Sequence, residues 1–245
     1  MIQLTVTEND YNESNLMYVQ SAMSEMFTYA GCTARLERNS GRAKLTINCA
    51  ECYSDIIKTE IADKVAEVVV IKYKYDFFKK NVSTSGLKTI EKEILLASLI
   101  AADLDDDKKY SLDKIKGYTN MAVDGVYNFR LKPLKKKWSD VASYIPTSFL
   151  NTQLKEFITY LLENKKKRVY VDCGKVYDSH YRRLRRSMLL GGDGVEIVRE
   201  VLLSGCGEVE LFGDIPKDDE FYLKEYYTDK IYFSNRFGGG GKYLN

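Results

Sequence analysis

Hydrophobic and polar positions in the first fifty residues follow two different periods. The first residues alternate between apolar and polar side chains, which is typical of a strand with one buried face. The next apolar positions recur at helical spacing and end before Gly31, where a left-handed cap would close a helix. Two further alternating runs flank Asn39-Ser40-Gly41, a sequence typical of a hairpin turn. The pattern predicts a strand at 1–7, a helix at 13–30 and hairpin strands at 33–38 and 43–49.

The middle of the chain keeps a helical period almost throughout. Its first stretch is long and apolar, and Ser54 stands where a side chain could cap the start. Pro133 lies inside a later stretch, which it either kinks or divides in two because proline lacks a backbone N–H. We expect helices at 53–80, 88–102, 106–117, 126–143 and 150–164.

The last third of the chain returns to mixed structure. Alternation predicts strands at 168–172, 208–212 and 230–233, and a broad apolar face predicts a helix at 194–204. We therefore expect an α+β fold with a small N-terminal β-α-β-β unit, a central helical block and a C-terminal strand-helix-strand element. These parts correspond to 1–52, 53–164 and 165–235, as separate units or as one integrated domain, followed by a flexible tail at 236–245.

Composition places the chain among globular proteins. Its 245 residues are 44% hydrophobic and 29% charged, which excludes a disordered chain. The net charge of +2 hides an uneven distribution. Residues 165–186 hold nine Lys or Arg and two Asp, a balance of +7, whereas residues 207–230 hold eight acids and three Lys, a balance of −5. The two segments either face each other in the fold or form separate charged surfaces.

The same composition indicates where the protein acts. No apolar run approaches the ~20 residues that span a bilayer, and the first residues lack the features of a signal peptide. The five cysteines are an odd number, which favours reduced thiols in the cytoplasm. We expect a cytoplasmic protein without a membrane partner.

Lysine and arginine gather in three short segments. Such groups neutralise phosphates, and the neighbouring Trp138, Tyr177 and Tyr181 offer planes on which bases could stack. The alternative is a solvated face that pairs with the acidic segment. The candidate nucleic-acid or polyanion-binding residues are Arg130, Lys132, Lys135, Lys136, Lys137, Trp138, Lys165, Lys166, Lys167, Arg168, Arg182, Arg183, Arg185 and Arg186.

Cys49 and Cys52 form a C-x-x-C sequence between a predicted strand and a predicted helix. A helix N-terminus lowers a thiol pKa, which would suit a redox pair, and two thiolates could instead bind zinc. Neither a second C-x-x-C nor a pair of histidines accompanies them, and buried unreactive cysteines are the alternative. We expect no metal site and no cofactor.

The remaining polar motifs do not assemble a reactive centre. His180 is the only histidine, so every Ser-His or Cys-His relay would depend on it. The Asp103-Leu104-Asp105-Asp106-Asp107 run resembles the start of a calcium loop, but Lys108 and Lys114 replace the turn glycine and the closing glutamate. An acidic helix N-terminus explains this run better. We assign no catalytic residue and favour a protein that is not an enzyme.

The segment Asp124-Gly125-Val126-Tyr127-Asn128-Phe129-Arg130-Leu131-Lys132 resembles the D-G-[FI]-x-x-F-R-L-K segment of the YtxC-like family, which is associated with sporulation in endospore-forming bacteria. The predicted helix at 150–164, followed by a basic turn and a strand, is similar as well. The motif residues of this resemblance are Asp124, Gly125, Phe129 and Arg130. The family has no established catalytic residue to carry over. Lys135-Lys136-Lys137 and Pro146 depart from its pattern.

Three functional hypotheses follow. The first is a non-catalytic cytoplasmic protein, similar to sporulation proteins, that acts through protein or polyanion contacts. The second is a nonspecific nucleic-acid-binding protein that uses the three basic segments. The third is a thiol-redox or zinc protein that uses Cys49 and Cys52.

Overall fold

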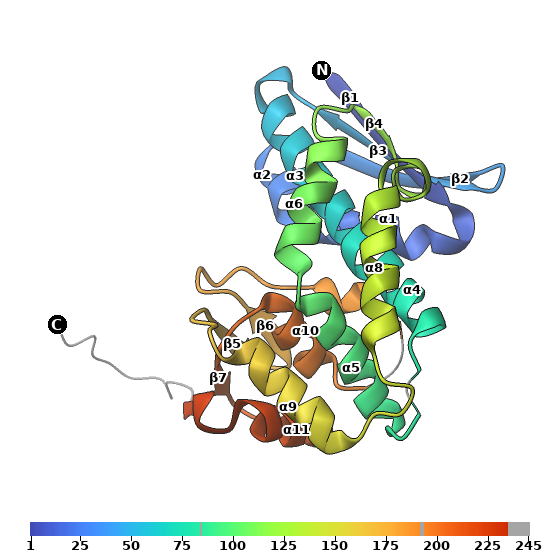
Figure 1. Cartoon of the computed structure of the whole chain (residues 1–245). Coiled ribbons are helices and arrows are strands. Elements are labelled where there is room, and N and C mark those ends of the chain that lie inside the picture. Colours follow the sequence, from blue (N-terminus) through green and yellow to red (C-terminus); the bar gives the residue numbers. More distant parts are fainter. Residues whose placement is uncertain (84, 192–193, 235–245) are drawn as a thin grey trace, which may run out of the picture. The chain divides into compact units, whose positions relative to one another are not determined.

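A computed structural model describes residues 1–83, 85–191 and 194–234 of the chain (Figure 1). The α+β fold is confirmed, and the strands form two separate four-stranded sheets. The chain divides into two compact units with boundaries that differ from the expected ones. Unit 1 comprises 1–83, 103–147 and 188–191, and unit 2 comprises the described parts of 84–102, 148–187 and 192–245. The expected tail at 236–245 lies outside the described residues.

The sheet of unit 1 contains the predicted N-terminal strand and hairpin. Its order is β2-β3-β1-β4, with β1 antiparallel to β3 and parallel to β4. Ser40 and Gly41 form the two-residue hairpin loop, and both adopt left-handed φ angles, of 51° and 77°. The strands are β1 (Ile2–Asn9), β2 (Thr33–Asn39), β3 (Arg42–Cys49) and β4 (Asn120–Ala122).

The helices of unit 1 follow the predicted periods, with interruptions. The helix expected at 13–30 is divided at Met23, and the one expected at 53–80 is continuous but contains a π-helical segment. All four residues of Val68–Ile71 in this segment are fully buried. Ser54 does not cap its helix and is itself buried. The elements are α1 (Glu13–Ala22), α2 (Ser24–Tyr29), α3 (Ser54–Glu67), η3 (Val68–Tyr73), α4 (Lys74–Asn81) and α6 (Leu104–Ile115).

Pro133 divides the helix expected at 126–143. It occupies the first turn of α8 (Lys132–Tyr144), where a missing N–H costs no hydrogen bond. Leu131 before it leaves the helical conformation, with φ −111° and ψ 28°. The residues upstream form α7 (Val123–Gly125) and the π-helical turn η4 (Val126–Arg130).

Unit 2 contains a second mixed sheet of order β6-β5-β7-β8, in which β5, β7 and β8 are parallel. Two helices connect these parallel strands, as such connections require. The strand β6 and the helix α11 were not predicted from the sequence. The strands are β5 (Arg168–Asp172), β6 (Lys175–Tyr177), β7 (Glu208–Phe212) and β8 (Ile231–Ser234); the helices are α5 (Thr89–Ala101), α9 (Asn151–Leu162), α10 (Glu196–Ser204) and α11 (Lys217–Tyr227).

Short 3-10 turns complete the described chain. They are η1 (Asp10–Asn12), η2 (Glu51–Tyr53), η5 (Arg186–Leu189) and η6 (Thr228–Lys230). Among the residues that the structure describes, no helix combines the length and the apolar character needed to cross a bilayer.

Candidate binding pocket of unit 1

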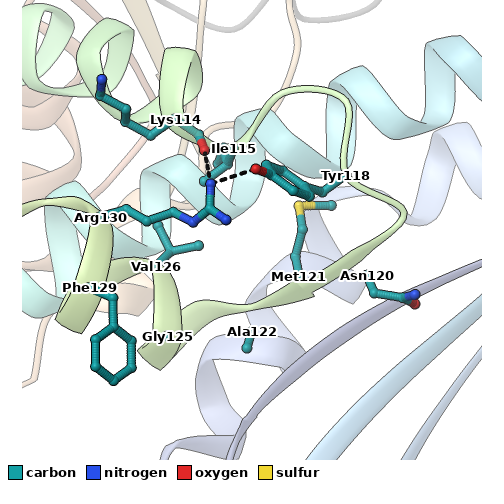
Figure 2. A pocket seen from close by; sticks show the side chains of 10 residues that line it. All are labelled: Lys114, Ile115, Tyr118, Asn120, Met121, Ala122, Gly125, Val126, Phe129 and Arg130. Carbon is teal, nitrogen blue, oxygen red and sulfur yellow. Dashed lines mark hydrogen bonds between the residues drawn. The ribbon is translucent and has the colours of Figure 1, made fainter.

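A pocket of about 380 Å³ opens in unit 1 beside the segment that carries the family resemblance (Figure 2). Its residues come from the end of α6, the following loop, β4 and the η4 turn. Ile115, Met121 and Val126 contribute buried apolar surface, and Arg130 contributes positive charge, whereas the Lys114 ammonium group points away towards Tyr110. Within the described chain, the residues that line this pocket include no carboxylate, thiol or imidazole. Lining of this kind suits binding through apolar contact and charge.

The local sequence explains how the pocket forms. Gly117 follows α6 with a left-handed φ of 89°, which lets the chain turn towards β4. Asp124 then fixes the turn after β4 to the sheet. Its carboxylate accepts hydrogen bonds from both terminal nitrogens of Arg42, at 2.5 and 2.9 Å. These hydrogen bonds lower the pKa of Asp124, so this motif residue is a structural anchor.

Arg130 is held in place at the pocket rim. Its guanidinium donates hydrogen bonds to the Tyr118 hydroxyl at 2.6 Å and to the Lys114 carbonyl at 3.3 Å, and lies 4.6 Å from the Tyr118 ring centroid (Figure 2). Arg130 nevertheless remains exposed. The next residue towards the N-terminus, Phe129, is 78% exposed and its ring points away from the guanidinium. The turn therefore presents an ordered cation and an accessible aromatic ring.

The first basic segment divides between two faces of α8. Lys132 and Lys136, four residues apart, are exposed. The ammonium group of Lys135 lies 3.8 Å from the ring centroid of Tyr127. Partial burial lowers the pKa of Lys135, and the charge of Lys132 acts in the same direction. Lys137 instead forms ion pairs with two aspartates of unit 1.

Trp138 does not belong to this surface, which corrects the sequence prediction. It is fully buried, and its indole N–H donates to Asp107 at 2.8 Å. Trp138 follows Leu134 by four residues, so the apolar face of the helix carries both into the core. A base therefore cannot stack on the indole.

Four charged side chains near Trp138 form an ion-pair network, of which Lys74 and Asp107 are buried. Lys74 contacts Asp103 and lies 2.7 Å from Asp107, and Lys137 lies 2.6 and 2.7 Å from the same two aspartates. Burial alone would raise the pKa of Asp103, but the two ammonium groups outweigh it and lower that pKa. The Asp-rich run therefore neutralises buried lysine as well as starting α6.

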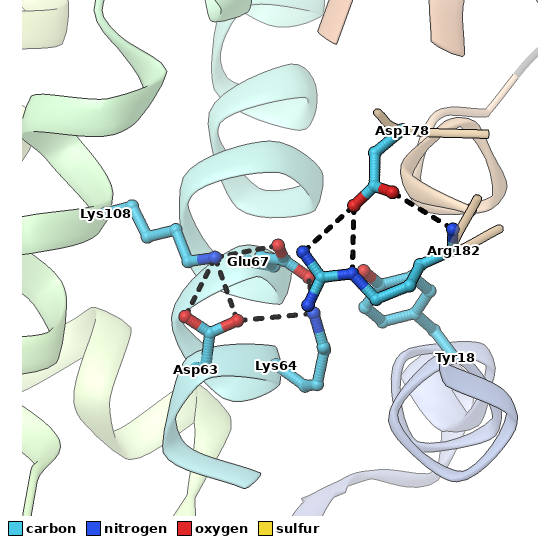
Figure 3. Close-up of polar contacts among 7 residues, drawn as sticks. All are labelled: Tyr18, Asp63, Lys64, Glu67, Lys108, Asp178 and Arg182. Carbon is cyan, nitrogen blue, oxygen red and sulfur yellow. Dashed lines mark hydrogen bonds and ion pairs between the residues drawn. The ribbon is translucent and has the colours of Figure 1, made fainter. Parts of the chain in front are cut away.

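A second buried carboxylate in unit 1 is also neutralised. Glu67 accepts hydrogen bonds from the Tyr18 hydroxyl at 2.6 Å, from Lys108 at 2.8 Å and from Lys64 at 2.9 Å (Figure 3). Asp63 contacts the same two lysines. This network joins α1, α3 and α6, and its carboxylates balance the two ammonium groups.

The second and third basic segments lie in unit 2. Lys165, Lys166 and Lys167 are exposed, whereas Arg168 pairs with Glu208 at 2.7 Å and Glu210 at 3.4 Å. The acidic segment therefore meets the basic one at this residue, because β5 and β7 are paired strands.

The third segment is also only partly exposed. Arg182 pairs with Asp178 at 3.0 Å (Figure 3), and Arg183 is exposed. Arg185 and Arg186 are half-buried, and Arg186 donates a hydrogen bond to the Leu203 carbonyl. The three segments thus contribute to two units, and part of each turns towards the protein interior.

The C-x-x-C cysteines have different environments. Cys49 is buried and Cys52 is exposed. The neighbour of Cys49 is Cys32, which lies one residue beyond the last β2–β3 pair, Thr33 and Asn48. Partial burial and the neighbouring Cys49 thiol raise the pKa of Cys32. Within the described ranges, no group of three or more His, Cys, Asp or Glu residues could hold a metal ion.

The chain was compared with family models, curated proteins and solved structures, and none of the three comparisons gave a match. The resemblance of residues 124–132 to the YtxC-like family therefore stays a prediction.

The sequence pattern did not identify the pocket residues that precede the motif, among them Lys114 and Tyr118. Lys114 was considered only as a misfit in a calcium loop, and Tyr118 was not singled out. The sequence does contain a signal for these residues, because the run Lys-Ile-Lys-Gly-Tyr at the end of the predicted helix comes shortly before a basic turn. Only the return of the chain to β1 places these residues beside Arg130.

Proposed function

We propose that the protein is a non-catalytic cytoplasmic binding protein, similar to sporulation proteins of the YtxC-like family. In this proposal the unit 1 pocket binds an acidic segment of a partner protein. The observation that carries the proposal is the combination of an apolar pocket floor with the fixed guanidinium of Arg130 and the exposed ring of Phe129. Arginine and aromatic side chains contribute strongly to protein interfaces.

Charge and shape together favour a peptide as the occupant. Arg130 attracts a carboxylate-rich segment, the exposed Lys132 lies two residues further along the chain, and the floor accepts an aliphatic side chain. Nucleic-acid binding at this pocket has less support because Arg130 already covers one face of Tyr118. Phe129 is then the one lining aromatic ring of the described pocket that is left for a base to stack on.

Fluorescence anisotropy with labelled peptides tests this proposal on the full chain. The probe is a short peptide of alternating Glu and Leu, and a Lys-Leu peptide of the same length is its control. We expect the acidic peptide alone to bind, and Arg130→Ala and Phe129→Ala each to weaken binding by about tenfold. Lys109→Ala, which removes an exposed cation from α6 outside the pocket, should leave binding unchanged. Equal binding of both peptides, or no effect of Arg130→Ala, would contradict the proposal.

A second candidate function rests on unit 2. Tyr181 is 67% exposed and stacks on Tyr170 with ring centroids 4.7 Å apart, close in sequence to the exposed Arg183. An exposed, supported aromatic ring with nearby cations suits single-stranded nucleic acid. Binding of a labelled oligothymidine that weakens steeply with salt and is lost in Tyr181→Ala would support this function. Salt-insensitive binding would contradict it.

The thiol hypothesis has the least structural support. Cys49 and Cys52 differ in burial, and burial next to a second thiol opposes thiolate formation at Cys32.

A further inference from the structure

The outer edge of β2 is a row of backbone groups that pair with no strand among the described residues. Asn39 and Arg42 flank the two-residue loop, so their backbones form a hydrogen-bonded pair. From this pair along the two strands, hydrogen-bonded pairs alternate with pairs that are not hydrogen-bonded. The N–H and C=O groups that point away from β3 consequently belong to Ala34, Leu36 and Arg38.

The opposite edge of the same sheet confirms this alternation. When the same alternation is followed from β3 to β1, the Thr5 N–H lies on the side of β1 that faces β4. That N–H donates to the Thr119 carbonyl at 2.9 Å.

The side chains of β2 differ between its two faces. Arg35 and Glu37 share one face, are 82% and 44% exposed, and form an ion pair at 2.7 Å. Leu36 lies on the other face opposite Leu45, which is fully buried. Leu36 itself is only half-buried, because β2 is the last strand of the sheet.

The strand is complementary to a second copy of itself. Leu36 is the midpoint of Thr33–Asn39, so a twofold axis through it pairs the entire strand with an antiparallel copy. In that register Arg35 of each copy lies opposite Glu37 of the other. An axis through Arg35 or through Glu37 would instead place like charges opposite each other, which is destabilising.

The hydrogen-bonding groups agree with the same register. An axis through Leu36 makes the two copies of this residue a hydrogen-bonded pair, and both have outward-facing N–H and C=O groups. Ala34 and Arg38 form the flanking pairs, again between outward-facing groups. One existing contact has to give way, since the Gln20 side chain donates to the Ala34 carbonyl at 3.4 Å. This bond is long and its donor is a flexible side chain.

We propose that β2 is a homodimerisation edge. Two copies of the chain pair their β2 strands antiparallel about Leu36, and the two four-stranded sheets of unit 1 become one continuous sheet. The hairpin that carries β2 extends beyond its neighbours in unit 1 (Figure 1). Pairing satisfies the exposed backbone groups and covers the apolar side chains at the edge.

A charge-swap series tests the register on the full chain by sedimentation equilibrium. Arg35→Glu alone and Glu37→Arg alone each place like charges opposite each other, so each should weaken dimerisation by about tenfold or more. The double variant Arg35→Glu/Glu37→Arg restores opposite charges and should dimerise as the natural chain does. An equimolar mixture of the two single variants should form a heterodimer, since one copy then carries two acids and the other two arginines.

The series separates specific pairing from misfolding. A variant that does not dimerise alone but forms a heterodimer in the mixture must be folded. Lys109→Glu, on α6, makes the same change of net charge as Arg35→Glu and should leave the dimer intact. A natural chain that stays monomeric across the whole concentration range overturns the proposal. A dimer that persists equally in Arg35→Glu and Glu37→Arg also overturns it, because another surface must then form the interface.

Discussion

The Nζ atom of Lys74 lies 2.7 Å from the Oδ2 atom of Asp107, and each side chain is only 1% exposed. The pair holds α4 against α6, and Trp138 of α8 donates to the same carboxylate. Three helices distant in sequence thereby share one buried charge network. Removal of Asp107 would leave Lys74 with Asp103 as its counter-ion and would take away the acceptor of the buried Trp138 N–H.

The Asp107→Ala variant should lose about 3–5 kcal/mol of unfolding free energy, because Lys74 then stays buried without this counter-ion. Chemical denaturation of the variant and of the natural chain measures the difference. Asp105→Ala is the matched control, since Asp105 is exposed on the same helix and should change stability by less than about 0.5 kcal/mol. Equal effects of the two substitutions would contradict the prediction.

The pair of Arg42 and Asp124 predicts a pH-dependent contribution to stability. Hydrogen bonds from Arg42 lower the pKa of Asp124 in the folded state, so the pair stabilises the fold above the unfolded-state pKa of aspartate. This contribution is lost as the pH falls through the folded-state pKa. We expect Arg42→Ala to cost about 2 kcal/mol at neutral pH, and the cost to shrink towards acid pH.

Denaturation curves recorded across the acid range measure this difference. Lys44→Ala is the control, because Lys44 is exposed on the same strand and should show no such trend. A cost of Arg42→Ala that stays constant down to strongly acid pH would disprove the assignment.

The thiols should differ in reactivity according to their burial. Alkylation followed by mass spectrometry should modify the exposed Cys52 and Cys173 first, and the buried Cys49 and Cys206 only on unfolding. Cys32 should react slowly at neutral pH and faster as the pH rises, since its pKa is raised by partial burial and by Cys49. Rapid alkylation of Cys49 in the folded protein would contradict this order.

Two glycines of unit 2 should respond differently to substitution by alanine. A Cβ atom at Gly207 would lie 2.0 Å from the Lys165 carbonyl oxygen, and backbone must move to admit it. Gly207→Ala should therefore cost more than about 3 kcal/mol of unfolding free energy.

Gly205 is the comparison within the same segment. It caps α10 with a left-handed φ of 64°, and a Cβ there would meet open space. Gly205→Ala should cost only about 1 kcal/mol, which reflects backbone conformation alone. Thermal denaturation of both variants checks that Gly207→Ala costs more than Gly205→Ala. Equal costs would show that the backbone near Gly207 moves to admit a Cβ atom without loss of stability.

The sequence predicted most elements from local patterns. The N-terminal strand, the hairpin with its Ser40-Gly41 loop and the long helix after Cys52 match the structure closely. The missed helix α11 carried a signal as well, since its buried residues recur at helical spacing. They are Asp219, Tyr222, Leu223, Tyr226 and Tyr227. Because tyrosines and acidic residues dominate this segment, its buried face does not read as apolar in the sequence.

The candidate site was less predictable. The sequence identified Phe129 and Arg130 but grouped Trp138 with them, because a run of adjacent basic and aromatic residues does not reveal which side of a helix faces the core. It also paired Cys49 with Cys52, its neighbour in sequence, whereas strand register places Cys49 beside Cys32.

The sequence by itself determined the elements and the α+β class, because hydrophobic period, glycine turns and proline act over a few residues. The tertiary structure decided which charges are neutralised in the core and which form surfaces. Lys137 and Lys136 are adjacent, yet Lys137 pairs with the buried Asp107 and Lys136 faces solvent. That division depends on acids about thirty residues away, which only packing brings within reach.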